Sequence, residues 1–206
     1  MLVRCRAGYA SGFDPRTASL FRRAAVPEVR RSEILKMNLS DWIEEKVTSD
    51  PRALEWFAET GSDDRIARAF RELLAGYEID PATILKTTRP LAADEAPGLV
   101  EVRDIHFFSL CAHHFLPFFG HVDLCYEPGE VILGLGKLPR LVDAYARRFQ
   151  IQEDLVRDVA REMMESGRAR GVRVRSRARH LCMCSRGPSN TSSETHTEFA
   201  LGSLAG

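Results

Sequence analysis

Apolar residues recur three or four positions apart between residues 38 and 77, which is the spacing of an amphipathic helix. One stripe follows Ser40, which we expect to cap its helix, and a second ends at Gly76. The segment 79–97 contains three prolines, and we expect mostly loop there, with Pro81 suited to open a short helix. The two stripes are Trp42, Ile43 and Val47, and Ile66, Phe70, Leu73 and Leu74.

After Gly98 the pattern changes to the alternation that is typical of strands. We expect a strand from Val100 to Phe107 with a bulge at Asp104, a half-buried strand over 121–126, and a short strand over 131–135. Apolar residues at helical spacing then predict one helix over 138–149 and another over 151–163.

A strict alternation follows the second helix. Apolar or small residues at even positions from Val172 to Ala178 alternate with arginines at odd positions, which predicts a strand with a basic solvent face. If this strand continues, His180, Cys182 and Cys184 share its apolar face. A last strand is expected over 195–201.

The order of these elements predicts an α+β domain, in which two helices cover one face of an antiparallel sheet. A helical region precedes it. We therefore divide the chain into a weakly patterned extension (1–37), a helical N-terminal region (38–97) and the α+β domain (98–206), which also contains the candidate chemistry described below.

Composition excludes several classes of protein. The 206 residues carry 29 basic and 29 acidic side chains, so the basic excess of a nucleic-acid-binding protein is absent. No apolar run approaches the ~20 residues of a membrane span, and the N-terminal arginines precede no apolar signal segment. Five cysteines, an odd number in a long chain, favour a reducing compartment, so we expect a cytoplasmic protein with neither nucleic acid nor membrane as a partner.

The most informative chemistry lies in two short Cys/His segments. Cys111 and His114 are three positions apart, and His180 and Cys182 are expected on one strand face. Two thiolates and an imidazole would leave the fourth position of a zinc ion open for water, as in catalytic sites. The alternative is that these cysteines are simply buried thiols. Cys184 could compete as a ligand, although we expect it to be a buried thiol.

Four longer motifs resemble those of GTP cyclohydrolase I, and they occur in that family's order within residues 62–200. CAHHFLPFFG resembles the family's CEHH…PFxG, and GLGKLPRLVD its GLSKLxRxV. YARRFQIQE and HLCMCSRG resemble ARRxQxQE and HxCMxxRG. The four segments are Cys111–Gly120, Gly134–Asp143, Tyr145–Glu153 and His180–Gly187.

The resemblance implies the tunnelling fold, in which sheets of neighbouring subunits form barrels, and a homodecamer with active sites between subunits. It also implies a role for each matching residue. Cys111, His114 and Cys182 would bind Zn²⁺, and His113 and His180 would exchange protons. The substrate-binding residues would be Glu153, helped by Gln152, for the guanine, and Lys137, Arg140, Arg186 and Arg65 for the triphosphate.

The implied activity is hydrolysis of GTP. Zinc-activated water would open the imidazole ring at C8, releasing formate and giving 7,8-dihydroneopterin triphosphate for folate, another pterin or a deazapurine. Two positions depart from the family pattern: Ala112 replaces Glu, and Gly136 replaces Ser. These two changes leave two alternative hypotheses. One is a diverged enzyme that takes another nucleotide or stops at the formamidopyrimidine, and the other is a non-catalytic member of the family that binds nucleotide. For each basic residue, a solvated surface charge is the alternative.

Overall fold

The computed structural model describes residues 38–86, 88–92 and 94–206, so the expected extension of residues 1–37 lies outside the described residues. The chain divides into two compact units, one reaching to Asp63 and the other spanning Asp64–Gly206. The division falls inside the region that the sequence predicts to be helical. No helix in the described ranges is both long and apolar enough to cross a membrane.

The described part of the first unit contains two short helices, α2 (Leu39–Lys46) and α3 (Pro51–Ala58). The side chain of Asn38 accepts a hydrogen bond from the backbone N–H of Asp41 at 2.8 Å, so Asn38 is the N-cap of α2. The expectation that Ser40 caps this helix is therefore wrong, because Ser40 already lies in its first turn. Asp50 caps α3, where Pro51 occupies the first helical position.

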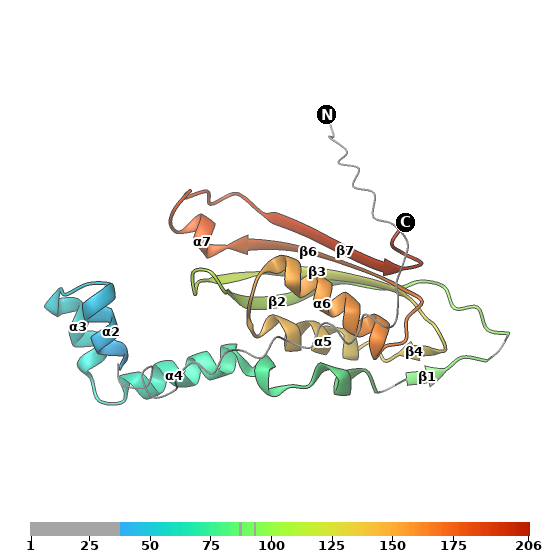
Figure 1. Ribbon diagram of the computed structural model, residues 1–206, viewed down its shortest axis with the longest axis horizontal. Helices are drawn as coiled ribbons and strands as arrows, with labels where there is room; N and C mark the ends of the chain where they lie inside the picture. Colours follow the sequence, from blue (N-terminus) through green and yellow to red (C-terminus); the bar gives the residue numbers. More distant parts are fainter. Residues whose placement is uncertain (1–37, 87, 93) are drawn as a thin grey trace, which may run out of the picture. The chain divides into compact units, whose positions relative to one another are not determined.

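The second unit is built on a five-stranded sheet in the order β5-β2-β3-β6-β7. All its neighbouring strands are antiparallel except β5, which pairs in parallel with β2. A separate two-stranded ribbon joins β1 to β4 (Figure 1). The strands are β1 (Thr88–Pro90), β2 (Val100–Cys111), β3 (Pro117–Glu127), β4 (Val131–Leu133), β5 (Phe149–Gln150), β6 (Gly171–His180) and β7 (Thr195–Gly202).

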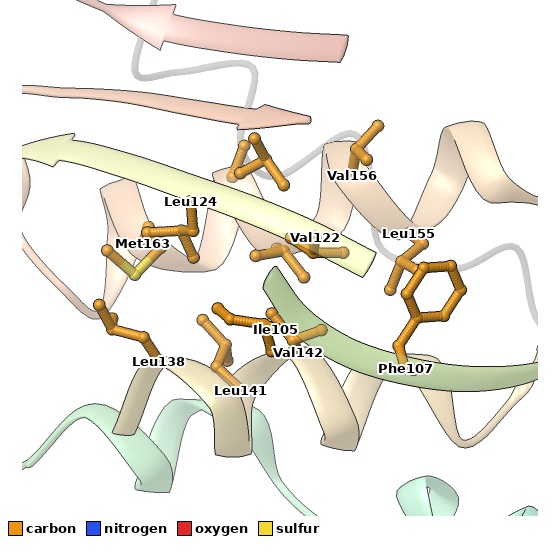
Figure 2. Close-up of a cluster of buried hydrophobic side chains, with 14 of the residues drawn as sticks. Ile105, Phe107, Val122, Leu124, Leu138, Leu141, Val142, Leu155, Val156 and Met163 are labelled. Atoms are coloured by element: carbon orange, nitrogen blue, oxygen red, sulfur yellow. The ribbon is translucent and has the colours of Figure 1, made fainter. Parts of the chain in front are cut away.

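Two helices, α5 and α6, cover one face of this sheet (Figure 1). Alternate residues of β2, β3 and β6 point toward them and are buried, while the arginines of β6 lie on the other face. Figure 2 shows the side chains from both layers packing together. This arrangement confirms the expected α+β class. The helical elements of the unit are α4 (Ser62–Leu73), whose first two residues belong to the other unit, η2 (Ala75–Glu78), η3 (Pro81–Lys86), α5 (Lys137–Ala146), α6 (Gln152–Glu165) and α7 (Leu181–Cys184).

The bulge expected at Asp104 is confirmed. The register between β2 and β3 shifts between Val102 and Ile105, and Asp104 adopts a left-handed conformation with φ of 56°. The backbone N–H of Asp104 has no partner in the β2–β3 hydrogen-bond ladder at the bulge, and it donates instead to the side chain of Asp123 at 2.8 Å.

The helix expected over 138–149 ends early, at Ala146. Phe149 and Gln150 instead form β5, whose partners in β2 are Leu110 and Cys111. Apolar spacing alone could not reveal this change, because the two-residue strand exists only through a tertiary pairing with β2. The ribbon strand β1, in the segment expected to be loop, was missed for the same reason.

Gly120 pairs with Ala178 where β3 lies beside β6, and there is no room for a side chain at this position. A Cβ atom built on Gly120 would lie 1.9 Å from the carbonyl oxygen of Arg177, and that oxygen belongs to the sheet backbone and has no room to move. We predict that Gly120→Ala lowers the free energy of unfolding by ~3 kcal/mol or more, as large overpacking and strain effects do. Urea unfolding measures this change.

Gly98→Ala is the matched control, because a Cβ at Gly98 meets nothing within 4 Å. Its unfolding free energy should stay within ~0.5 kcal/mol of the native value. Equal effects from the two substitutions would contradict the close approach of the strands at Gly120.

Candidate metal centre and its histidine

The first part of the site lies where β2 turns into β3. Cys111 ends β2 and is 4% exposed, and the five-residue loop 112–116 presents His114 beside it. The Cys111 Sγ and His114 Nδ1 atoms are 3.8 Å apart. A spacing of three residues brings the two side chains together because the loop is closed by a hydrogen bond from the Phe115 N–H to the Cys111 carbonyl.

The second part comes from the end of β6. The expectation that this strand continues through Cys184 is wrong, since β6 ends at His180 and residues Leu181–Cys184 form one helical turn, α7. Cys182 is 9% exposed and faces the first part of the site from this turn. Cys184 is half-buried and lies outside the group. Residues two positions apart share one face of a strand but point in different directions on a helix, so Cys182 and Cys184 diverge in α7.

Cys111, His114 and Cys182 converge, with one ligand atom from each lying within 4.8 Å of the others. In the described part of the chain, this is the one cluster of three or more Cys, His, Asp or Glu side chains placed to hold a metal. Tetrahedral zinc with typical bond lengths would place its sulfur and nitrogen ligands ~3.6 Å apart, close to the distance observed between Cys111 and His114. The donor set therefore fits zinc and leaves a fourth position open.

The pKa of the Cys182 thiol is raised. Burial is the main cause, because it disfavours the thiolate, and the neighbouring sulfur of Cys111 adds to the effect. The positive charge of Arg186 acts weakly in the opposite direction. A metal is bound by the thiolate form of cysteine, so a metal that bound here would release protons from the thiols.

His180 is held on two sides next to this group. Its ring stacks on Phe118, with centroids 4.6 Å apart and an angle of 3° between the planes. Its Nε2 atom lies 2.8 Å from Oε1 of Gln152. Burial lowers the pKa of His180, and the charge of Glu153 partly opposes that shift.

Gln152 is 1% exposed and its amide group is fully engaged. Its nitrogen donates to the Ser176 hydroxyl at 2.7 Å and to the Thr195 carbonyl at 3.0 Å. Because a carbonyl can only accept, the amide orientation is fixed and Oε1 must face His180 as an acceptor. In neutral His180 the proton is therefore on Nε2, and Nδ1 is the basic atom.

These bonds support a role for Gln152 in orienting His180. The role expected from the family resemblance, helping Glu153 to bind guanine, stays a prediction. Sequence reasoning missed Ser176 and Phe118 as parts of this arrangement. A signal existed for Ser176, which is a polar residue on the otherwise apolar face of β6.

We predict that Gln152→Ala lowers turnover ~10–100-fold, the range typical for loss of a partner that orients a residue in a metal site, while zinc stays bound. The His180 ring would lose its acceptor, and Ser176 would lose its donor. The free energy of unfolding should also fall by ~1–3 kcal/mol. Steady-state kinetics, zinc analysis and urea unfolding measure the three effects.

Gln150→Ala is the matched control. The Gln150 amide also bridges buried groups, the Ser109 hydroxyl and two carbonyls of α5, but does not touch His180. We expect a similar loss of stability and a smaller loss of turnover. If both variants lose turnover equally, the effect of Gln152 is on folding alone.

The remaining predicted site residues come from several elements. His113 is exposed in the loop beside His114, with ring centroids 6.2 Å apart, and Glu153 is exposed in the first turn of α6. The charge of Glu153 affects the pKa of His180, and the charge of Arg186 affects the pKa of Cys182. Both charged residues therefore lie near the Cys/His group. The other three basic residues lie on two helices: Lys137 and Arg140 in the first turn of α5, and Arg65 in α4.

An open Cys/His donor set beside an oriented histidine, on an α+β scaffold, is typical of a metal-dependent hydrolase. The chain belongs to the GTP cyclohydrolase I family, whose model matches residues 43–205. This match confirms the resemblance and the expected class of enzyme. With the sheet and its two helices, it also supports the tunnelling fold.

Similar proteins bear the same name. "GTP cyclohydrolase 1" of Campylobacter lari is 45% identical over 140 residues, 68% of this chain and 73% of that protein. "GTP cyclohydrolase 1" of Leptospira biflexa is 37% identical over 165 residues, 80% of this chain and 87% of that protein. Among solved structures, the archaeosine synthase QueF-Like in the apo form is 18% identical, with a TM-score of 0.45 over 53% of this chain and 99% of that one.

Proposed function

We propose that the chain hydrolyses GTP, opening the guanine imidazole ring at C8 with release of formate and forming 7,8-dihydroneopterin triphosphate. The observation that carries the proposal is the convergence of Cys111, His114 and Cys182 beside an oriented His180, in a chain of the GTP cyclohydrolase I family. The product would serve folate or another pterin pathway.

The metal would be Zn²⁺, held by Cys111, His114 and Cys182, and when bound it would supply an activated water for the hydrolysis. Glu153 would bind the guanine, because a carboxylate accepts two parallel hydrogen bonds from the N1–H and the 2-amino group. His180 would pass protons through Nδ1, since Nε2 is bonded to Gln152. His113, exposed on the adjoining loop, would be the second proton-exchanging group.

The triphosphate would be held by the remaining basic side chains. Arg140, Arg186 and Arg65 are exposed, and Lys137 is half-buried. Cationic side chains suit phosphate oxygens, and guanidinium groups can bind them through two parallel hydrogen bonds. Lys137 and Arg140 are three residues apart in α5, so they can act on one phosphate chain.

We propose further that copies of the chain assemble through their sheets into a homo-oligomer. The specific assembly that we propose is a decamer whose active sites lie between subunits. Within the described residues, β7 pairs only with β6, which leaves its other edge able to pair with a second copy. The cysteines of the described part are free thiols, which supports a reducing compartment such as the cytoplasm.

A diverged activity is the second candidate, and Ala112 is the observation that favours it. This residue lies in the exposed loop between Cys111 and His113, and its side chain offers no carboxylate to either neighbour. An enzyme with this change could take another purine nucleotide or stop at the formamidopyrimidine.

One assay separates these candidates. Zinc-loaded protein is incubated with GTP, and formate release and pterin fluorescence are followed together. Both signals support the proposed reaction, whereas formate or a formamidopyrimidine without a pterin supports the diverged enzyme. No turnover of any purine nucleotide, with zinc shown to be bound, overturns both and favours a non-catalytic member.

A further inference from the structure

The loop that carries His113 and His114 contains a strained residue. Residues 112–116 connect β2 to β3, and the loop is closed by two hydrogen bonds: Cys111 N–H to the Leu116 carbonyl at 2.8 Å, and Phe115 N–H to the Cys111 carbonyl at 2.9 Å. Phe115, its fourth residue, has a φ of 60°. Glycine and asparagine adopt this left-handed conformation readily, but a bulky aromatic residue does not.

Contacts from outside the loop offset this cost. The Phe115 ring packs against Phe70 of α4, with centroids 4.9 Å apart, and against Phe149 of β5, with centroids 4.8 Å apart. Two aromatic contacts are together comparable in size to the cost of one residue in the left-handed region. The loop is therefore held in a shape that its own sequence does not favour.

The first residue of the loop is also anchored to β5, the strand that contains Phe149. The Ala112 N–H donates to the Gln150 carbonyl at 3.1 Å, and Cys111 pairs with Gln150 in the parallel ladder between β2 and β5. A backbone hydrogen bond thus fixes Ala112, the first residue of the loop, and aromatic packing fixes Phe115 near its end. His113 and His114 lie between these two anchors.

We propose that Phe115 is a positioning residue, which holds His114 at the metal and His113 beside it through its contacts with Phe70 and Phe149. The inference rests on the proposed function in one respect, that the Cys/His group binds zinc. A glycine at this position would relieve the strain but lose both anchoring contacts, so the loop would sample other conformations. Metal affinity should then fall although the fold remains.

The test compares Phe115→Gly with Phe115→Tyr, which keeps the ring. Zinc affinity is measured by chelator competition, and the geometry of the ligands by the visible absorption bands of the Co²⁺-loaded protein. We expect Phe115→Gly to lose ~10-fold or more in zinc affinity and to broaden the Co²⁺ bands, as loss of ligand support typically does. Phe115→Tyr should retain both properties.

Two further variants separate positioning from general damage. Phe70→Ala should weaken zinc binding in the same direction, and the double variant with Phe115→Gly should be no weaker than Phe115→Gly alone. Phe108→Ala removes an aromatic residue that stacks on Phe119 elsewhere in the same hairpin, and it should leave zinc affinity unchanged. If Phe115→Gly does not fold, Phe115→Asn replaces it, since asparagine tolerates the left-handed region but has no ring.

Native zinc affinity and an unchanged Co²⁺ spectrum in Phe115→Gly or Phe115→Asn would overturn the inference. The same holds if Phe108→Ala weakens binding as much. A native chain that binds zinc but turns over no purine nucleotide overturns the proposed function alone, because the comparison of zinc affinities still decides the role of Phe115. A native chain that binds no zinc overturns both.

Discussion

Cys182→Ser should lose the metal and with it the activity. The substitution removes one of the three side chains that converge on the candidate centre, and a serine hydroxyl at this buried position is a poor ligand for zinc. Loss of a residue that only hydrogen-bonds a metal ligand typically weakens metal binding ~10–100-fold, so loss of the ligand itself should lower metal affinity by at least as much. Zinc content after exhaustive dialysis and formate release from GTP measure the two effects.

Cys184→Ser is the matched control for this experiment. Cys184 lies two residues further along α7, half-buried and outside the group of three ligand atoms. Its replacement should leave both zinc content and turnover close to native. Full zinc in Cys182→Ser, or equal loss in the two variants, would show that the ligand set is assigned wrongly.

His180→Ala should separate metal binding from chemistry. His180 is bonded to Gln152 and stacked on Phe118, and it is not among the three converging ligands. We expect zinc to remain bound and kcat to fall by ~10²–10⁴-fold, the usual contribution of a positioned general acid or base. Metal analysis of the same sample used for kinetics makes the comparison direct.

His196→Ala is the corresponding control. His196 is exposed on β7, where it pairs with Glu194, so its removal should change neither zinc content nor kcat. If His180→Ala retains native kcat, the proton-transfer role belongs to another group, and His113 is then the first to test. If it loses zinc, His180 contributes to holding the metal.

Local patterns in the sequence predicted most of the sheet and its two covering helices. The alternation in β6 and the bulge at Asp104 were readable because each is recorded within a few residues of the chain. The short strand β5 and the turn α7 were not, since both interrupt a pattern that could equally have continued. Phe149 illustrates this: its spacing fits the preceding helix, and only pairing with Leu110 places it in a strand.

For the candidate site, too, the sequence predicted some features and only the structure showed the others. The sequence by itself supplied the residue types, with Cys111 and His114 at a local spacing and motifs that identify the family. It could not show that Gln152 turns away from the surface to orient His180, or that Phe115 is held in a left-handed conformation.

What the sequence determined, then, is the class of chemistry and the pattern of elements, because residue identity and local periodicity are properties of neighbouring positions. The tertiary structure alone decided which side chains meet. Cys182 reaches Cys111 and His114 only because β3 lies between β2 and β6 in the sheet and α7 turns at the end of β6. Contacts between residues so far apart in the chain depend on the packing of the whole domain, and no local pattern records them.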